Sequence, residues 1–267
     1  AHNDDISWYD YQYDTFDKID TNDKVVILKD RQMGISTILS VYALYNALFD
    51  IGSVNVILSP KADPDRRIIR LIDAVFRTLV TNYGVYIPDI VSRTQSEIIF
   101  SNGSIISTAY AYERGDRNYH DGVLTHDFYG NYTYPSKITN LFVDEYAFFD
   151  ESHIEKFNRH VGFNPNKIVI SSTAHIDEDN EFYKLWKRSE KGMGEYYPIK
   201  LKWDMRPDRT EEWKMKQDRL LGTTLTKREH EFEFEQTNEV KMADITNTLK
   251  EYAKSKLHER TILVGSK

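Results

Sequence analysis

The sequence has no cysteine among its 267 residues. This absence excludes disulfide bonds and metal sites built on thiolates, and it fits a protein of the reducing cytosol. No apolar run approaches the roughly 20 residues that a membrane-spanning helix needs, and the polar N-terminus predicts no signal peptide. We therefore expect a protein that works without a membrane.

Positive charge is not in excess either. Lys and Arg number 35 against 42 Asp and Glu, which gives a formal net charge of −7. Because proteins bind duplex DNA largely through cations that contact its phosphates, this balance excludes a surface that is basic all over. A role in DNA handling would therefore need a local basic patch, another domain or another subunit.

The composition is otherwise that of an ordinary soluble globular protein. Hydrophobic residues make up 40% of the chain and charged residues 29%. Internal repeats and low-complexity segments are absent from the sequence. The length permits one large domain or two small ones with a sizeable core.

The strongest local pattern, within residues 24–44, is a short apolar strand followed by a polar loop and a helix. Residues 25–28 are rich in β-branched side chains, as in a strand buried on both faces, and the apolar spacing becomes helical from Ser36. A loop between such elements presents backbone N–H groups and the positive end of a helix dipole to an anion. Residues 29–36 are therefore a candidate phosphate loop.

This loop departs from the GxxxxGK[ST] pattern of phosphate loops. Gly34 and Ser36 match the second glycine and the hydroxyl, but Ile35 occupies the lysine position and Lys29 that of the first glycine. Two interpretations remain open from these residues alone. One is a turn that binds no ligand, because the charge that reaches the β and γ phosphates is missing. In the other, Lys29 supplies the ammonium from the strand end on its flexible four-carbon stem.

An acidic pair ends a second hydrophobic strand, predicted at residues 138–145. There Asp144 is placed to hold Mg²⁺, and Glu145 to polarise a water. A further buried strand at residues 167–172 leads into Thr173. Because ligands of a parallel sheet bind beyond the carboxyl ends of its strands, we expect these groups and the phosphate loop to converge.

The other predicted elements follow from periodicity and turn residues. Residues 118–136 show no periodicity and predict a long surface loop, which in a compact domain is functional or poorly ordered. Strands are expected at 54–58, 97–100, 104–110 and 196–201, and helices at 64–80, 181–190, 209–220, 226–236 and 240–257.

An aromatic stretch at residues 6–19 precedes the phosphate loop. An aromatic beside a glutamine, here Tyr11 and Gln12, can stack on an adenine and hydrogen-bond its edge. The alternative is a Tyr-rich amphipathic helix that only contributes to the core.

Taken in order, these elements resemble the ATPase domain of the large terminase subunit, the DNA-packaging motor of tailed bacteriophages. The resemblance covers roughly residues 9–236. Its motifs are the aromatic-glutamine element Tyr11-Gln12, the phosphate loop with Arg31, Gln32 and Gly34, the pair Arg114-Gly115, the acidic motif at 143–148 and the triplet Ser171, Ser172 and Thr173.

The resemblance implies a fold: α/β, a three-layer P-loop NTPase of the ASCE or RecA-like kind, with a mainly parallel central sheet flanked by helices. Residues 1–236 would form this ATPase domain, and residues 237–267 a C-terminal helical tail or linker. Full-length large terminases also carry a C-terminal nuclease domain, for which the residues after Gln236 are too few. We therefore expect no nuclease activity from this chain.

The resemblance also implies roles for individual residues. Several terminases have a deviant Walker A loop whose lysine sits at its start, which is where Lys29 lies. Glu145 would position and activate water, whereas Ser36 and Asp144 would hold Mg²⁺. Residues 171–173 would couple hydrolysis to movement. The implied ATP contacts are Tyr11, Gln12, Lys29, Arg31, Gln32, Met33, Gly34, Ile35, Ser36 and Thr37.

Two arginines are expected to act on the γ phosphate. Arg31 lies within the loop and would act in cis. Arg114 follows the predicted strand 104–110 beside Gly115, which suits presentation to a neighbouring subunit in a ring. A solvated arginine is the alternative, and Arg117 could serve in its place.

The implied function is Mg-dependent ATP hydrolysis that moves double-stranded DNA into a procapsid, in the cytoplasm of the infected bacterial host. The portal protein and the small terminase subunit are the expected partners. A homo-oligomeric ring is expected when the motor is assembled, with a monomer as the alternative state in isolation. Two alternative functions remain. A helicase-type motor would need a second similar domain, and a nucleotide-binding structural module would hydrolyse little ATP because Ile35 replaces the usual lysine.

Overall fold

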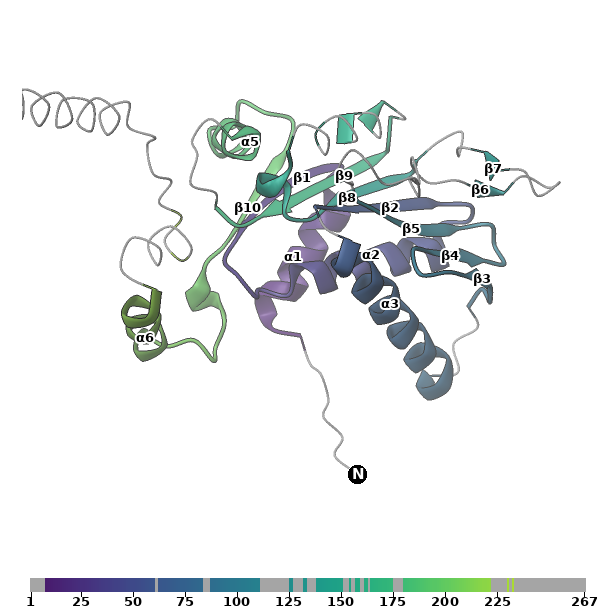
Figure 1. The fold of residues 1–267 in the computed structure, drawn as a ribbon, viewed down its shortest axis with the longest axis horizontal. Helices are drawn as coiled ribbons and strands as arrows, with labels where there is room; N and C mark the ends of the chain where they lie inside the picture. Colours follow the sequence, from purple (N-terminus) through teal and green to yellow (C-terminus); the bar gives the residue numbers. More distant parts are fainter. Residues whose placement is uncertain are drawn as a thin grey trace, which may run out of the picture.

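The chain folds around one eight-stranded sheet with helices on both faces (Figure 1). The computed structural model describes residues 8–60, 62–83, 87–110, 125–126, 132–133, 138–150, 154, 157–158, 161–162, 164–174, 180–221, 230 and 232. The strands are β1 (Lys24–Lys29), β2 (Val54–Ser59), β3 (Ile90–Arg93), β4 (Glu97–Phe100), β5 (Ile105–Tyr110), β6 (Thr125–His126), β7 (Tyr132–Thr133), β8 (Asn140–Val143), β9 (Lys167–Ser172) and β10 (Tyr197–Leu201). The helices are α1 (Asp10–Thr21), α2 (Ile35–Phe49), α3 (Ala62–Tyr83), α5 (Glu181–Glu190) and α6 (Glu211–Leu221), with 3-10 turns η1 (Tyr146–Phe148) and η2 (Trp203–Met205).

The order of the strands brings three carboxyl ends together. In the large sheet the order is β10-β1-β9-β8-β2-β5-β4-β3, and neighbours from β10 to β5 are parallel. Strand β9 therefore lies between β1 and β8, so the loops after these three strands leave the same edge side by side. Strands β4 and β3 continue the sheet as antiparallel neighbours.

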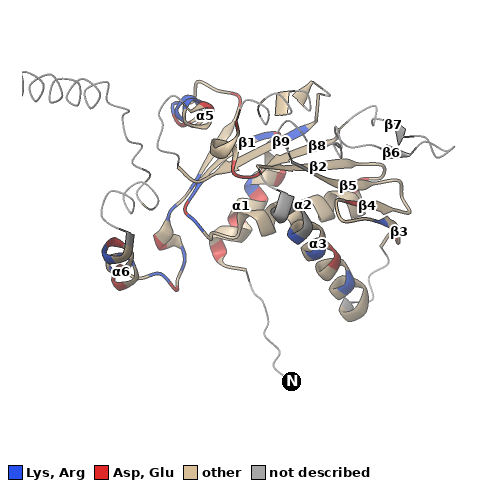
Figure 2. Cartoon of the chain, in the orientation of Figure 1, with Lys and Arg blue, Asp and Glu red and all other residues tan. Residues whose placement is uncertain are grey.

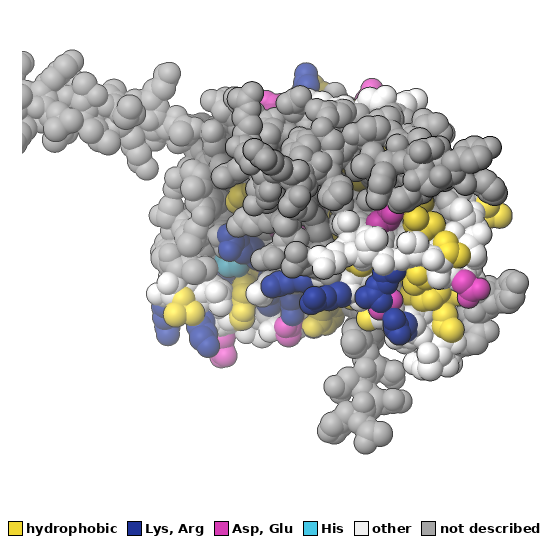
Figure 3. Space-filling view, turned by 45° about the vertical axis from the view of Figure 1, so that its right-hand side comes forward, with side chains coloured by type: hydrophobic (Ala, Val, Ile, Leu, Met, Phe, Trp, Pro, Cys, Tyr) yellow, Lys and Arg dark blue, Asp and Glu magenta, His cyan; other side chains and the backbone are white. Residues whose placement is uncertain are grey.

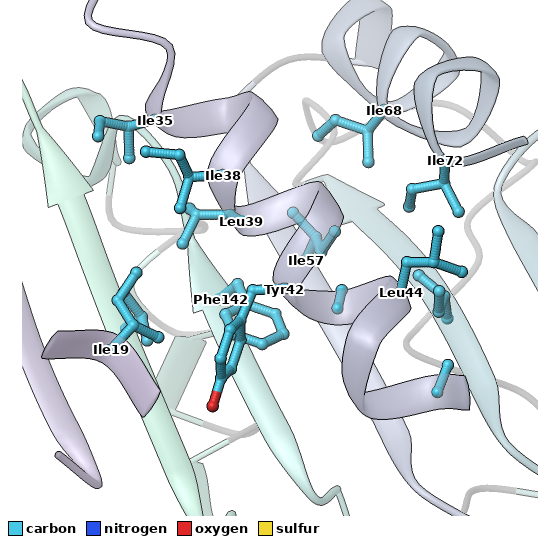
Figure 4. Packing of buried hydrophobic residues seen from close by; sticks show 14 of the residues in the cluster. Ile19, Ile35, Ile38, Leu39, Tyr42, Leu44, Ile57, Ile68, Ile72 and Phe142 are labelled. Carbon is cyan, nitrogen blue, oxygen red and sulfur yellow. The ribbon is translucent and has the colours of Figure 1, made fainter. Parts of the chain in front are cut away.

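Two apolar clusters bury the two faces of the sheet. Because successive strand residues point to opposite faces, Val25 and Ile27 pack with the helices α1 to α3, whereas Val26 and Leu28 pack with η1 and α5. Figure 4 shows the first cluster, in which α2 and α3 lie over the sheet. There the rings of Tyr42 and Phe142 meet edge to face, with 5.9 Å between their centroids. This confirms the α/β class and the helix-sheet-helix layers.

The predicted strands and helices are present wherever the structure describes them, with shifts of a few residues at their ends. Strand β3 was not predicted, because three of its four residues are exposed and give no apolar run. Residues 118–136, expected as a loop throughout, contain the antiparallel pair β6 and β7, each only two residues long. The helices predicted at 226–236 and 240–257 lie outside the described residues, apart from the isolated residues 230 and 232. Within the described part of the chain, no helix is long and apolar enough to cross a membrane.

A buried lysine in strand β9 bonds the end of the first helix. Lys167, at the start of β9, donates from Nζ to the carbonyls of Ile19 (2.6 Å), Asp20 (3.2 Å) and Asn22 (2.7 Å). Carbonyls at the end of a helix have no partner within the helix, so this ammonium replaces the missing donors. It also places the end of α1 beside the central strand.

Replacing this lysine should destabilise the fold. Lys167→Met removes the donor from three carbonyls at the end of α1, of which that of Ile19 is buried, and we expect the free energy of unfolding in urea to fall by about 2 kcal/mol. Lys24→Met is the matched control, because Lys24 only pairs with the exposed Glu195 at the surface. Equal losses in the two variants would contradict the capping role.

Candidate functional site

The loop between β1 and α2 has the backbone shape of an anion-binding turn. Gln32 (φ 60°) and Gly34 (φ 76°) both adopt the left-handed conformation, and α2 starts directly after Gly34. The positive φ favours glycine at position 34, and a Cβ there would lie 2.4 Å from Nε2 of Gln12, so the Gln12 side chain would have to move. The loop therefore ends at a helix N-terminus, with its free N–H groups.

Lys29 places a buried charge beside this loop. Its Nζ lies 2.6 Å from Oε1 of Glu145 and 3.9 Å from Oδ1 of Asp144. Burial by itself would lower the pKa of Lys29, but the charges of Asp144 and Glu145 together outweigh it and raise the pKa above its ordinary value. The ammonium therefore stays protonated, and it lies at the strand end where the sequence placed it.

The carboxylate of Asp144, directly after β8, bonds both the start of α2 and the end of β9. One carboxylate oxygen, Oδ2, accepts a hydrogen bond from the hydroxyl of Ser36, and the other, Oδ1, accepts one from the hydroxyl of Ser171 at 2.8 Å. Its side chain is 9% exposed. A hydroxyl and a carboxylate side by side are the oxygen ligands that Mg²⁺ prefers.

The charge of the cluster also fits a divalent cation. One ammonium, of Lys29, faces two carboxylates, of Asp144 and Glu145, which leaves a surplus of negative charge. Among the described residues no group of three His, Cys, Asp or Glu could hold a metal without further ligands. In nucleotide enzymes the protein usually gives Mg²⁺ few ligands, and phosphates and waters give the rest.

Glu145 is the more accessible of the two acids. Its side chain is 33% exposed, and the residue adopts φ 56°, which is uncommon for a residue with a Cβ. Its Oε2 lies 3.5 Å from the hydroxyl of Ser172 and 3.5 Å from both N and Oγ1 of Thr173. The left-handed backbone thus turns this carboxylate toward the end of β9, in contact with the Ser/Thr triplet.

The other predicted nucleotide contacts divide by burial. Met33 and Ile35 have buried side chains, so only their backbone is available to a ligand, whereas Arg31, Gln32 and Ser36 are exposed. Thr37 is half-buried at the start of α2.

Tyr11 and Gln12 support the loop from α1. The hydroxyl of Tyr11 donates to the Met33 carbonyl at 2.9 Å, and burial raises the pKa of this hydroxyl to about 12. Nε2 of Gln12 lies 3.4 Å from the same carbonyl, and its Oε1 accepts from the N–H of Tyr9 at 3.0 Å. With 6% of its surface exposed, Tyr11 is placed to hold the loop and has little surface left for stacking on a base.

A buried ionic cluster next to the loop was not predicted from the sequence. The carboxylate of Asp30 is fully buried and pairs with Arg209, Nη1 to Oδ2, at 2.9 Å. Nδ1 of His230 lies 2.9 Å from Oδ1 of the same carboxylate. The only available signal was an acidic residue in the loop, and acidic loop residues are usually solvated.

Arg114, Gly115 and Arg117 lie outside the described residues. The structure therefore places none of these residues relative to the site.

Comparisons of the sequence found no match, whereas comparison of the fold found similar solved structures. No protein-family model matches the chain, and no curated protein matches it in sequence. A mutant of the large terminase ATPase domain of Thermus phage P74-26 superposes with a TM-score of 0.59 and 17% identity, over 80% of this chain and 90% of that one.

Full-length large terminases match over a part of their length. The large terminase of a thermophilic bacteriophage gives a TM-score of 0.57 with 10% identity, over 83% of this chain and 52% of that chain. That of bacteriophage HK97 gives 0.54 with 10% identity, over 77% and 41%. The chain therefore has the fold of large terminase ATPase domains.

Proposed function

We propose that this chain hydrolyses ATP with Mg²⁺ and that hydrolysis drives double-stranded DNA into a viral procapsid. The observation that carries the proposal is the convergence of Lys29, Ser36, Asp144 and Glu145 beside a loop that ends at a helix N-terminus. Large terminases of similar fold support it, since that of the thermophilic bacteriophage has been solved in complex with ADP and with ATP-γ-S.

Binding begins with an exchange of partners at Lys29. In the structure the ammonium bonds the Glu145 carboxylate, and a phosphate in the loop would compete for the same ammonium. Transfer of Lys29 to the phosphate leaves Glu145 with only the longer contacts to Ser172 and Thr173. Nucleotide binding thereby frees the carboxylate for catalysis. Mg²⁺, held by Ser36 and Asp144, would neutralise charge on the phosphates.

Glu145 then acts as the acceptor of a proton. The attacking water gives this proton to the carboxylate while its oxygen bonds to the γ phosphorus and the bond to ADP breaks. Asp144 is less suited to the role, because both of its oxygens already accept hydrogen bonds and its side chain is nearly buried.

The end of β9 is the proposed route from chemistry to movement. The Ser172 hydroxyl accepts from the N–H of Ala147, just after the acidic pair, and contacts Glu145 itself. A change of charge at Glu145 would therefore act on both β9 and η1. We propose that these elements couple hydrolysis to movement through residues 171–173.

We propose that several copies of the chain together bind the DNA, rather than one basic face of a single copy. Figure 2 shows acidic and basic residues together on α3, α5 and α6, and on the face drawn in Figure 3 the coloured basic groups are small and lie near acidic ones. Among the side chains of α3 that the structure describes, the exposed arginines are Arg67, Arg70 and Arg77, of which Arg77 pairs with Asp73. A ring of copies, with the portal protein and the small terminase subunit, in the cytoplasm of the infected bacterium, is the assembly that we propose.

The first test is the loop lysine. Lys29→Ala should lower phosphate release by at least about 100-fold, because a donor to the transferring phosphate is lost. Lys24→Ala, at the other end of β1, is the matched control and should keep the parent rate. Circular dichroism checks that both variants are folded. Parent activity in Lys29→Ala would show that the loop is not the nucleotide site.

The acidic pair should separate binding from turnover. Glu145→Gln removes the proton acceptor and keeps the shape, so we expect ATP affinity near that of the parent and almost no phosphate release. Asp144→Asn should in addition lose the dependence of nucleotide binding on Mg²⁺. The measurements are fluorescent-ATP binding with and without Mg²⁺ and steady-state hydrolysis. Near-normal turnover in both variants would move the catalytic site elsewhere.

Arg114 is proposed to act on the ATP of a neighbouring subunit. Arg114→Ala should then be inactive alone, and mixing it with Glu145→Gln should recover part of the hydrolysis, since each chain supplies what the other lacks. The assay needs DNA and high protein concentration so that rings form. Normal hydrolysis by Arg114→Ala alone would exclude this arginine and leave Arg117 as the next candidate.

These assays, together with an assay of duplex unwinding, separate the alternative functions. A nucleotide-binding structural module would bind ATP-γ-S and release no phosphate under any of these conditions. A helicase-type motor would hydrolyse ATP and unwind a duplex, which the proposed packaging motor would not.

A further inference from the structure

Three consecutive carbonyls of the phosphate loop are each bonded by a side chain from a distant part of the chain. The Arg31 carbonyl accepts from Nη2 of Arg209 at 2.7 Å, and the Gln32 carbonyl from Nη1 of Arg206 at 2.6 Å. The Met33 carbonyl accepts from Tyr11, as described above. Two of the three donors therefore come from the short segment between η2 and α6.

These bonds fix the direction of the loop's N–H groups. In a trans peptide the C=O and the following N–H point in opposite directions. The N–H groups of the next three residues, Gln32, Met33 and Gly34, therefore point away from the side chains that hold the preceding carbonyls. An anion-binding loop requires this orientation, because an inward carbonyl would repel a phosphate.

Both guanidinium groups are themselves held in place. Arg206 forms a bidentate pair with Asp208, using Nε (2.9 Å) and Nη2 (2.6 Å), which leaves Nη1 for the Gln32 carbonyl. Arg209 is buried between Asp30 and the ring of Trp213, with 4.5 Å from its guanidinium carbon to the ring centroid. A lysine could not reproduce either arrangement, because each uses the planar fork of arginine.

We propose that Arg209 and Arg206 are positioning residues of the nucleotide site, which act on the bound phosphates through the carbonyls of the phosphate loop. This inference rests on the proposed function, since it concerns how the same loop binds ATP. It also makes ATP affinity depend on the segment that leads into α6. By linkage, bound nucleotide must stabilise the docking of that segment to the same extent.

The test measures the affinity for ATP-γ-S with Mg²⁺ in four proteins: the parent, Arg209→Lys, Arg206→Met and Arg219→Lys. Arg219 is the matched control, an exposed arginine in the last turn of α6. We expect Kd to rise about tenfold in Arg209→Lys and about threefold in Arg206→Met, from the loss of charge-assisted hydrogen bonds. Arg219→Lys should bind like the parent.

Thermal unfolding without nucleotide separates positioning from stability. A residue that only stabilises the fold would lower Tm and leave Kd of the folded protein unchanged, and this result would overturn the inference. Arg206 is less buried than Arg209, with 20% of its side chain exposed against 4%, so Arg206→Met decides the matter if Arg209→Lys does not fold. If the parent binds ATP-γ-S and the Arg209 and Arg206 variants bind it with the same Kd, the inference is contradicted and the proposed function is not. If the parent binds no ATP-γ-S, the proposed function and the inference are both contradicted.

Discussion

The site depends on the pairing of one buried ammonium with two carboxylates. A buried charge is costly unless it is paired, so Lys29 can remain buried only where Asp144 and Glu145 reach it. The sheet provides this by placing β1 and β8 on either side of β9. Serines from the adjacent elements then satisfy the remaining carboxylate oxygens. The strand order thus brings together the polar residues at the strand ends, and these residues set the charge of the site.

A second constraint acts on the phosphate loop from outside the central strands. Its carbonyls are bonded from α1 and from the segment before α6. Residues that are far apart in the chain therefore meet on a few loop peptides. We propose that the loop keeps its shape only while both segments are docked, so that nucleotide binding depends on the docking of α1 and of the segment before α6.

Much of the fold follows from local patterns. The buried strands β1, β2 and β9 are continuous apolar runs, and the helices that cover them have clear periodicity, so these were predicted from the sequence. The convergence of the groups at Lys29, Asp144 and Ser171 followed from the rule that parallel strands share one ligand-binding edge. Long-range pairings were not predictable in this way. Asp30 and Arg209 are separated by 179 positions, and neither residue type nor spacing indicates that they are buried together.

The most direct measurement is a crystal structure of the chain grown with ADP and Mg²⁺. The account predicts that residues 30–36 enclose the β phosphate, that Nζ of Lys29 has moved from Glu145 to a phosphate oxygen, and that Mg²⁺ lies beside Ser36 and Asp144. Nucleotide bound elsewhere, or bound with Lys29 still paired to Glu145 and away from the phosphates, would contradict it.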